Sequence, residues 1–122
     1  FKGILDGSGR VVFDGRILVE RDAQRTDAML SNHNLMLSRA AEVDTKPQLE
    51  IFADDVKCSH GTTVGELDHD MLFYLRSRGV PLVEARQMLC AGFAQEVLDR
   101  IENTALRARA GRQLTSRLKT AV

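Results

Sequence analysis

The stretch Asp54-Asp55-Val56-Lys57-Cys58-Ser59-His60-Gly61 separates two different patterns of apolar residues. Short apolar runs broken by turn residues precede it, and helical spacing follows it. Cys58 and His60 are two positions apart, so in an extended strand their side chains lie on the same face. The neighbouring Lys57 favours the ionised thiol. A thiolate beside an imidazole predicts a site that receives sulfur or iron.

The composition of the 122-residue chain limits its class. An apolar content of 43% suffices for one core, arranged as one compact unit or two small lobes. Seventeen basic residues balance seventeen acidic ones, which argues against binding to nucleic acid or to a membrane surface. Two cysteines make no disulfide framework, so we expect a cytoplasmic protein with reduced thiols. Because the first residue, Phe1, stands within a predicted strand, we expect a piece of a longer protein.

Residues 1–58 carry short apolar runs that come in pairs. Successive pairs begin at Val11, Ala28 and Leu49, which lie 17 and 21 residues apart. A spacing near twenty, with strands of three or four residues, is typical of a parallel β-solenoid, because each coil buries its apolar side chains against its neighbours. An antiparallel meander is the alternative, although it rarely gives paired runs.

The turn residues between these runs fit coil corners. The Asp6-Gly7-Ser8-Gly9 and Asp14-Gly15 segments supply positive φ angles, which would also serve in hairpins. The Asn32-His33-Asn34 segment is interpreted as a further corner, with His33 as a ligand being the less favoured alternative. Pro47 lacks a backbone N–H donor and therefore favours the beginning of a strand.

The period becomes helical after a connector predicted over residues 61–65. Asp68 is suited to cap a first helix, and Pro81 begins a second that we expect to run to about residue 101. Asn103 is suited to cap a third helix, whose basic run is more typical of a solvated face than of a phosphate-binding patch. Cys90 falls among apolar residues of the second helix and is expected to pack in the core.

Three sequence segments together resemble the C-terminal part of the SufB/SufD family, and most of all its SufD branch. They are residues 42–61 (EVDTKPQLEIFADDVKCSHG), 63–65 and 72–79 (LFYLRSRG), and the resemblance extends from about Phe13 to Leu98. The family consists of scaffold subunits of the SUF iron–sulfur cluster assembly system. The resemblance implies the last coils of a right-handed parallel β-helix over residues 1–62 and a C-terminal domain of two to three helices over residues 63–122.

The resemblance also implies partners and roles. Such subunits pair with a SufB-like subunit through their β-helices and dock a SufC-like ABC ATPase through the C-terminal helices. His60 then corresponds to the residue held to lie near the nascent iron–sulfur cluster, with Cys58 as a further motif member. We expect no stable cluster on this piece alone, because two ligands do not fill a typical iron–sulfur site. We also expect self-association through the open β-helix end.

Bland interpretations remain beside these. Cys58 fits equally a small buried hydrophobe, and a purely structural adaptor would recruit the ATPase without using His60. His69 is expected to be exposed, and Asp54 and Asp55 point to opposite faces of an extended segment, which argues against a paired acid and base. The sequence has no Walker loop, CxxC or HExxH motif, so we expect a protein that is not an enzyme.

Overall fold

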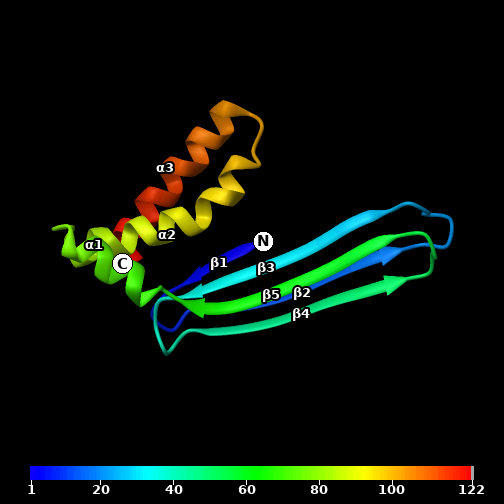
Figure 1. The fold of residues 1–122 in the computed structure, drawn as a ribbon, viewed down its shortest axis with the longest axis horizontal. Coiled ribbons are helices and arrows are strands. Elements are labelled where there is room, and N and C mark those ends of the chain that lie inside the picture. Colours follow the sequence, from blue (N-terminus) through cyan, green and yellow to red (C-terminus); the bar gives the residue numbers. More distant parts are fainter. Residues whose placement is uncertain (122) are drawn as a thin grey trace.

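The computed structural model describes residues 1–121, which form five strands followed by three helices (Figure 1). The mixed β and α class predicted from the sequence is confirmed. The strands are β1 (Lys2–Leu5), β2 (Arg10–Val19), β3 (Asp27–Met36), β4 (Glu42–Ile51) and β5 (Lys57–Glu66). The helices are α1 (His69–Ser77), α2 (Leu82–Asp99) and α3 (Thr104–Ala121).

Consecutive strands alternate between two sheets. One sheet has the order β1-β3-β5 and the other pairs β2 with β4, and every pairing is parallel. The antiparallel meander is therefore excluded for this part of the chain. Partners lie 31 residues apart in β1–β3, 32 in β2–β4 and 30 in β3–β5. The predicted spacing near twenty, with strands of three or four residues, is wrong because the strands are ten residues long from β2 onward.

The two apolar runs of a pair belong to one long strand, and the polar residues between them continue it. Asn32-His33-Asn34 lies inside β3, so the predicted corner there is wrong. Alternate residues of β3 point inward, and Asn32 and Asn34 are 3% and 2% exposed. The Asn34 Nδ2 donates to the Asn32 Oδ1 at 2.8 Å. This side-chain hydrogen bond offsets part of the cost of burying two amides.

Glycine and proline also occur in strand interiors. Gly15 is in the middle of β2, where a Cβ atom would lie 2.7 Å from the Phe13 ring, so its role is close packing rather than a corner. Pro47 pairs with Gly15 and is the sixth residue of β4, not its beginning. In the described chain β4 pairs only with β2, and proline is tolerated on such an edge. Only the corner at Gly7, with φ +57°, is confirmed.

The helix boundaries follow their capping residues. Asp68 Oδ1 accepts hydrogen bonds from the backbone N–H of Asp70 and Met71, and Gly79 ends the first helix with φ +86°, as predicted. Asn103 Oδ1 accepts from the Leu106 N–H and begins α3. The connector predicted over residues 61–65 is wrong, because β5 continues to Glu66. The strands thus extend past the boundary expected at residue 62.

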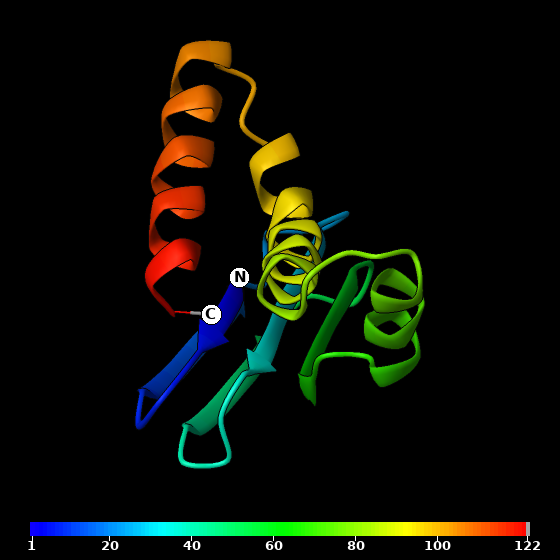
Figure 2. The ribbon, with the colours of Figure 1, turned by 90° about the vertical axis from the view of Figure 1, so that its left-hand side faces the viewer.

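A small apolar cluster joins the sheets to the helices. Its buried members come from β3, α2 and α3: Leu35, Cys90 and Leu118. Ile4, Leu67 and Phe93 are among the half-buried side chains around them. Figure 2 shows α2 and α3 side by side, with α1 set apart from them. In the described part of the chain, none of the helices has the length and apolar character needed to cross a membrane.

Candidate functional site at the β5 edge

The two site residues predicted from the sequence lie together on the last strand of a sheet. Cys58 and His60 alternate with Ser59 in β5, so their side chains share one face. Their partners in β3 are Ala28 and Leu30. Leu30 is buried, which identifies this face as the one that continues the interior of the strand region. Cys58 is half-buried and His60 is exposed, so this interior row becomes accessible at β5.

The accessible row occurs at an unpaired strand edge. Within the described residues β5 pairs only with β3, so its other side presents free backbone donors and acceptors. Val64, on the same face as His60, is 53% exposed although its β3 partner Asn34 is buried. An unpaired edge with an accessible apolar residue is typical of a surface that another strand covers.

The turn before β5 fixes where the strand starts. The Asp55 N–H donates to Gln24 Oε1 at 2.9 Å, and the Asp55 carbonyl accepts from the Arg25 N–H at 2.6 Å. Arg25 adopts a positive φ of 64°. The Lys57 N–H then donates to the Thr26 carbonyl. These bonds hold the turn against its neighbour and set the register that places Cys58 and His60.

The local donor set is small. No group of three or more His, Cys, Asp or Glu side chains with metal-binding geometry occurs in residues 1–121. Cys58 and His60 offer one sulfur and one nitrogen, whereas iron in clusters takes four ligands, sulfide included. Any metal bound at this edge therefore needs further ligands from outside the described residues.

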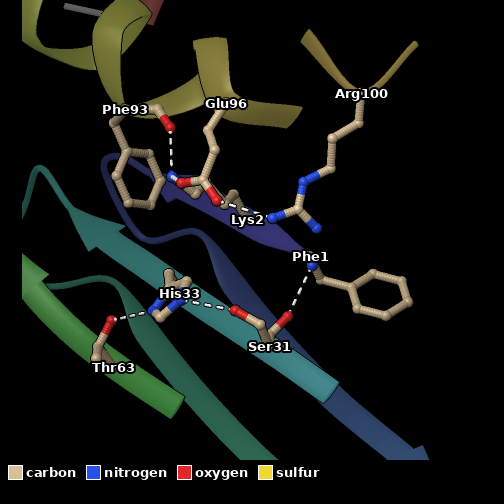
Figure 3. A network of polar contacts seen from close by, with 8 residues as sticks. All are labelled: Phe1, Lys2, Ser31, His33, Thr63, Phe93, Glu96 and Arg100. Carbon is tan, nitrogen blue, oxygen red and sulfur yellow. Dashed lines mark hydrogen bonds and ion pairs between the residues drawn. The ribbon is translucent and has the colours of Figure 1, made fainter. Parts of the chain in front are cut away.

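His33 takes part in a hydrogen-bonded row that sequence patterns did not predict. Its Nε2 lies 2.7 Å from Ser31 Oγ and its Nδ1 lies 2.7 Å from Thr63 Oγ1 (Figure 3). Both ring nitrogens thus have hydroxyl partners, which disfavours the alternative of His33 as a metal ligand. The pairing of His33 with Thr63 in the β3–β5 ladder places this row on the opposite face from His60. The signal available was only the Ser-x-His spacing.

Comparison with known proteins assigns the chain to a family. The family model described as "SUF system FeS cluster assembly, SufBD core domain" matches residues 1–93. The chain belongs to the SufBD family.

Three relatives place the chain within that family. It is 49% identical to the iron–sulfur cluster assembly protein SufD of Escherichia coli, over 93% of this chain and 28% of that protein. A SufBD family protein of Synechocystis is 48% identical over 88% of this chain, and SufD of Bacillus subtilis 35% over 81%. These matches cover 24% and 23% of the two relatives. The chain thus spans about a quarter of the length of these relatives.

In this SufBD-family chain the other cysteine lies in the core. Cys90 is fully buried, and burial raises the pKa of its thiol despite the opposing influence of nearby Arg86. The prediction that Cys90 packs in the core is confirmed. His69, the first residue of α1, is exposed as predicted and lines a polar cavity.

A charged contact ties the first strand to the helices. Lys2 Nζ donates to the Phe93 carbonyl at 2.9 Å and to Glu96 Oε2 at 2.7 Å (Figure 3). The ammonium also lies 4.6 Å from the centre of the Phe93 ring. Arg100 Nη2 bonds the other Glu96 oxygen at 2.9 Å. The hydrogen bond from Lys2, its charge and the Arg100 charge together hold the pKa of Glu96 below its ordinary value.

Replacing Lys2 with methionine is expected to raise the pKa of Glu96. Lys2 is the largest cause of its depression, whereas the remaining Arg100 keeps the value below the ordinary one. A depressed carboxyl pKa stabilises the fold above its unfolded pKa and loses this effect as the pH falls through the folded value. NMR titration of the Glu96 side-chain carboxyl measures the shift. An unchanged pKa would show that Lys2 is not the controlling neighbour.

Proposed function

We propose that this chain is part of a non-catalytic scaffold subunit for iron–sulfur cluster assembly, with β5 at its contact with a SufB-like subunit. One observation carries the proposal: Cys58 and His60 share one face of a strand whose outer edge is unpaired in the described chain. The names of the relatives, which include iron–sulfur cluster assembly proteins, support the same role. The nascent cluster is cargo here, not a resident cofactor.

We infer that the strand region forms the end of a right-handed parallel β-helix. The alternation of parallel strands between two sheets, with pairing distances of 30 to 32 residues, supports stacked coils. In such a stack the last coil leaves its edge open, and a related subunit with an open coil of its own would extend both sheets by backbone hydrogen bonds. His60 would then face the subunit boundary.

The chemistry of the pair suits a shared site. A thiolate binds iron or carries sulfur, and a neutral imidazole nitrogen is a common iron ligand. Because this chain offers only two such groups at β5, the partner would complete the coordination. We assign ATP hydrolysis to a separate subunit, since the sequence has no phosphate-binding glycine loop. Reduced thiols at Cys58 and Cys90 fit a cytoplasmic location.

The helices offer a surface for a SufC-like ATPase. A cavity of about 820 Å³ opens between α1 and α2, with a predominantly apolar lining that includes Met71, Tyr74, Met88 and Phe93. Met71, Tyr74 and Met88 are each more than half exposed. Large accessible apolar patches of this kind are typical of protein contacts. The α2 helix, which forms one wall, is tied to β1 through Lys2, so a load on the helices would reach the strand region.

The test is replacement of His60 in the full-length protein, followed by complementation of cluster assembly in cells. Alanine at this position removes a ligand and is expected to abolish complementation, whereas His60→Cys keeps a ligand atom and should retain part of the activity. Complex formation with both partner subunits should be unchanged in the two variants, because His60 is an exposed side chain. Full activity of His60→Ala in an intact complex would favour the purely structural adaptor.

A further inference from the structure

A polar cavity of about 300 Å³ lies where the strands meet the helices. Ser38 and Arg39 enter it from the segment after β3, and Glu66 from the end of β5. His69 at the start of α1 and Arg86 of α2 complete its polar lining. These residues come from four separate places in the sequence, so the fold alone brings them together.

A neighbouring cavity of about 460 Å³ extends the polar region. It shares the wall made by His69 and Leu72 and adds Arg76 of α1. The two cavities together thus present three guanidinium groups and an imidazole. Their apolar walls, formed in part by Met36 and Leu72, would accommodate a short carbon segment.

The positive charges of the three arginines are not balanced by nearby side chains. Among the described residues Arg39, Arg76 and Arg86 form no ion pair within 4.0 Å, and Glu66 forms none either. The next acidic residues along the chain are directed elsewhere: Asp68 caps α1, and both Asp68 and Asp70 line the apolar cavity between α1 and α2. An excess of positive charge therefore remains in the polar cavity.

Arg86 shows an unmet hydrogen-bonding requirement. Its Nη2 reaches the Leu37 carbonyl at a long 3.4 Å, and its Nε is buried without any acceptor. A buried guanidinium donor without a partner is unfavourable, whereas an oxyanion supplies acceptors to Nε and Nη2 at once. The geometry therefore favours an anion bound beside Arg86.

We propose that this cavity binds a small molecule carrying a dianionic oxyanion, of the chemical class of a phosphate monoester. Three arginines set against the single carboxylate of Glu66 match the charge of about −1.5 to −2 that such a group has near neutral pH. Arg39 and Arg86 would hold the phosphate oxygens, and Ser38 would donate a further hydrogen bond. This site is separate from the proposed cluster site and does not depend on it.

The test is NMR titration of the full chain with inorganic phosphate and with glycerol 3-phosphate, each against sodium chloride at equal ionic strength. Saturable shifts are expected at the backbone amides of Ser38 and His69 with both anions. Arg86→Gln and Arg39→Gln should each weaken binding roughly tenfold, the loss of one charge-assisted contact. The matched control is Arg112→Gln, because Arg112 is an exposed arginine of α3 away from both cavities.

Three results would overturn the proposal. One is the absence of saturable shifts beyond those of chloride. The second is equal weakening by Arg112→Gln, which would indicate diffuse screening. The third is binding of an acidic peptide without binding of either phosphate, which would make the cavity a protein contact. Thermal unfolding of each variant shows whether it is folded, and the exposed Arg39 keeps the test valid should Arg86→Gln fail to fold.

Discussion

Replacing Leu35 with alanine is expected to lower the free energy of unfolding by about 2–5 kcal/mol, the range for deleting a buried leucine side chain. Leu35 is 7% exposed and lies in the cluster with Cys90 and Leu118. It also pairs with Ile4 of β1 and Gly65 of β5. The substitution leaves a cavity between the strands and the helices, so both should lose stability together. Urea denaturation followed by circular dichroism measures the change.

Leu106→Ala provides the matched control for this prediction. It makes the same chemical change on α3 at a side chain that is 55% exposed, so the loss should stay below about 1 kcal/mol. Equal losses in the two variants would mean that the cluster around Leu35 does not hold the strands and helices together. A separate, unchanged transition for the helices in Leu35→Ala would lead to the same conclusion.

The second large effect concerns the two cysteines, which should differ in alkylation rate by at least about 100-fold under native conditions. Cys90 is fully buried and burial raises its pKa, so little thiolate forms and the reagent reaches it only when the structure opens. Cys58 is half-buried at the unpaired β5 edge and needs no such opening. Stopped labelling with iodoacetamide followed by mass spectrometry gives both rates.

Single-cysteine variants separate the two signals. Cys90→Ser reports on Cys58 alone, and Cys58→Ser reports on Cys90 alone. In denaturant the two rates should converge, because both thiols are then in water. Rapid native labelling of Cys90 in Cys58→Ser would show that the α2 core opens readily, and slow labelling of Cys58 would show that the β5 edge is covered in solution.

Local sequence signals were sufficient wherever a structure depends on neighbouring residues. Asp68, Gly79 and Asn103 marked helix ends correctly because a cap bonds only to the first or last turn of its own helix. Cys58 and His60 share a face for the same reason, since alternation along a strand is a local property. The family motif spans this region, and so the candidate site was predictable.

Local signals failed where a distant partner decides the conformation. Asn32 and Asn34 resemble turn residues, yet their amides bond to each other inside β3. Gly15 occupies a strand interior because the Phe13 ring and Leu30 leave no room for a Cβ atom. The strand period was misjudged because polar residues inside long strands resembled turns between short ones.

The sequence by itself determined the helix caps, the family, and the pairing of a thiol with an imidazole on one strand face. The tertiary structure alone decided which strands are neighbours, because partners lie 30 to 32 positions apart and their register depends on backbone hydrogen bonds between coils. It also decided the contact of Lys2 with Glu96 and the gathering of Arg39 and Arg86 around one cavity. Charges so far apart in sequence interact only after packing of the apolar cluster brings their elements together.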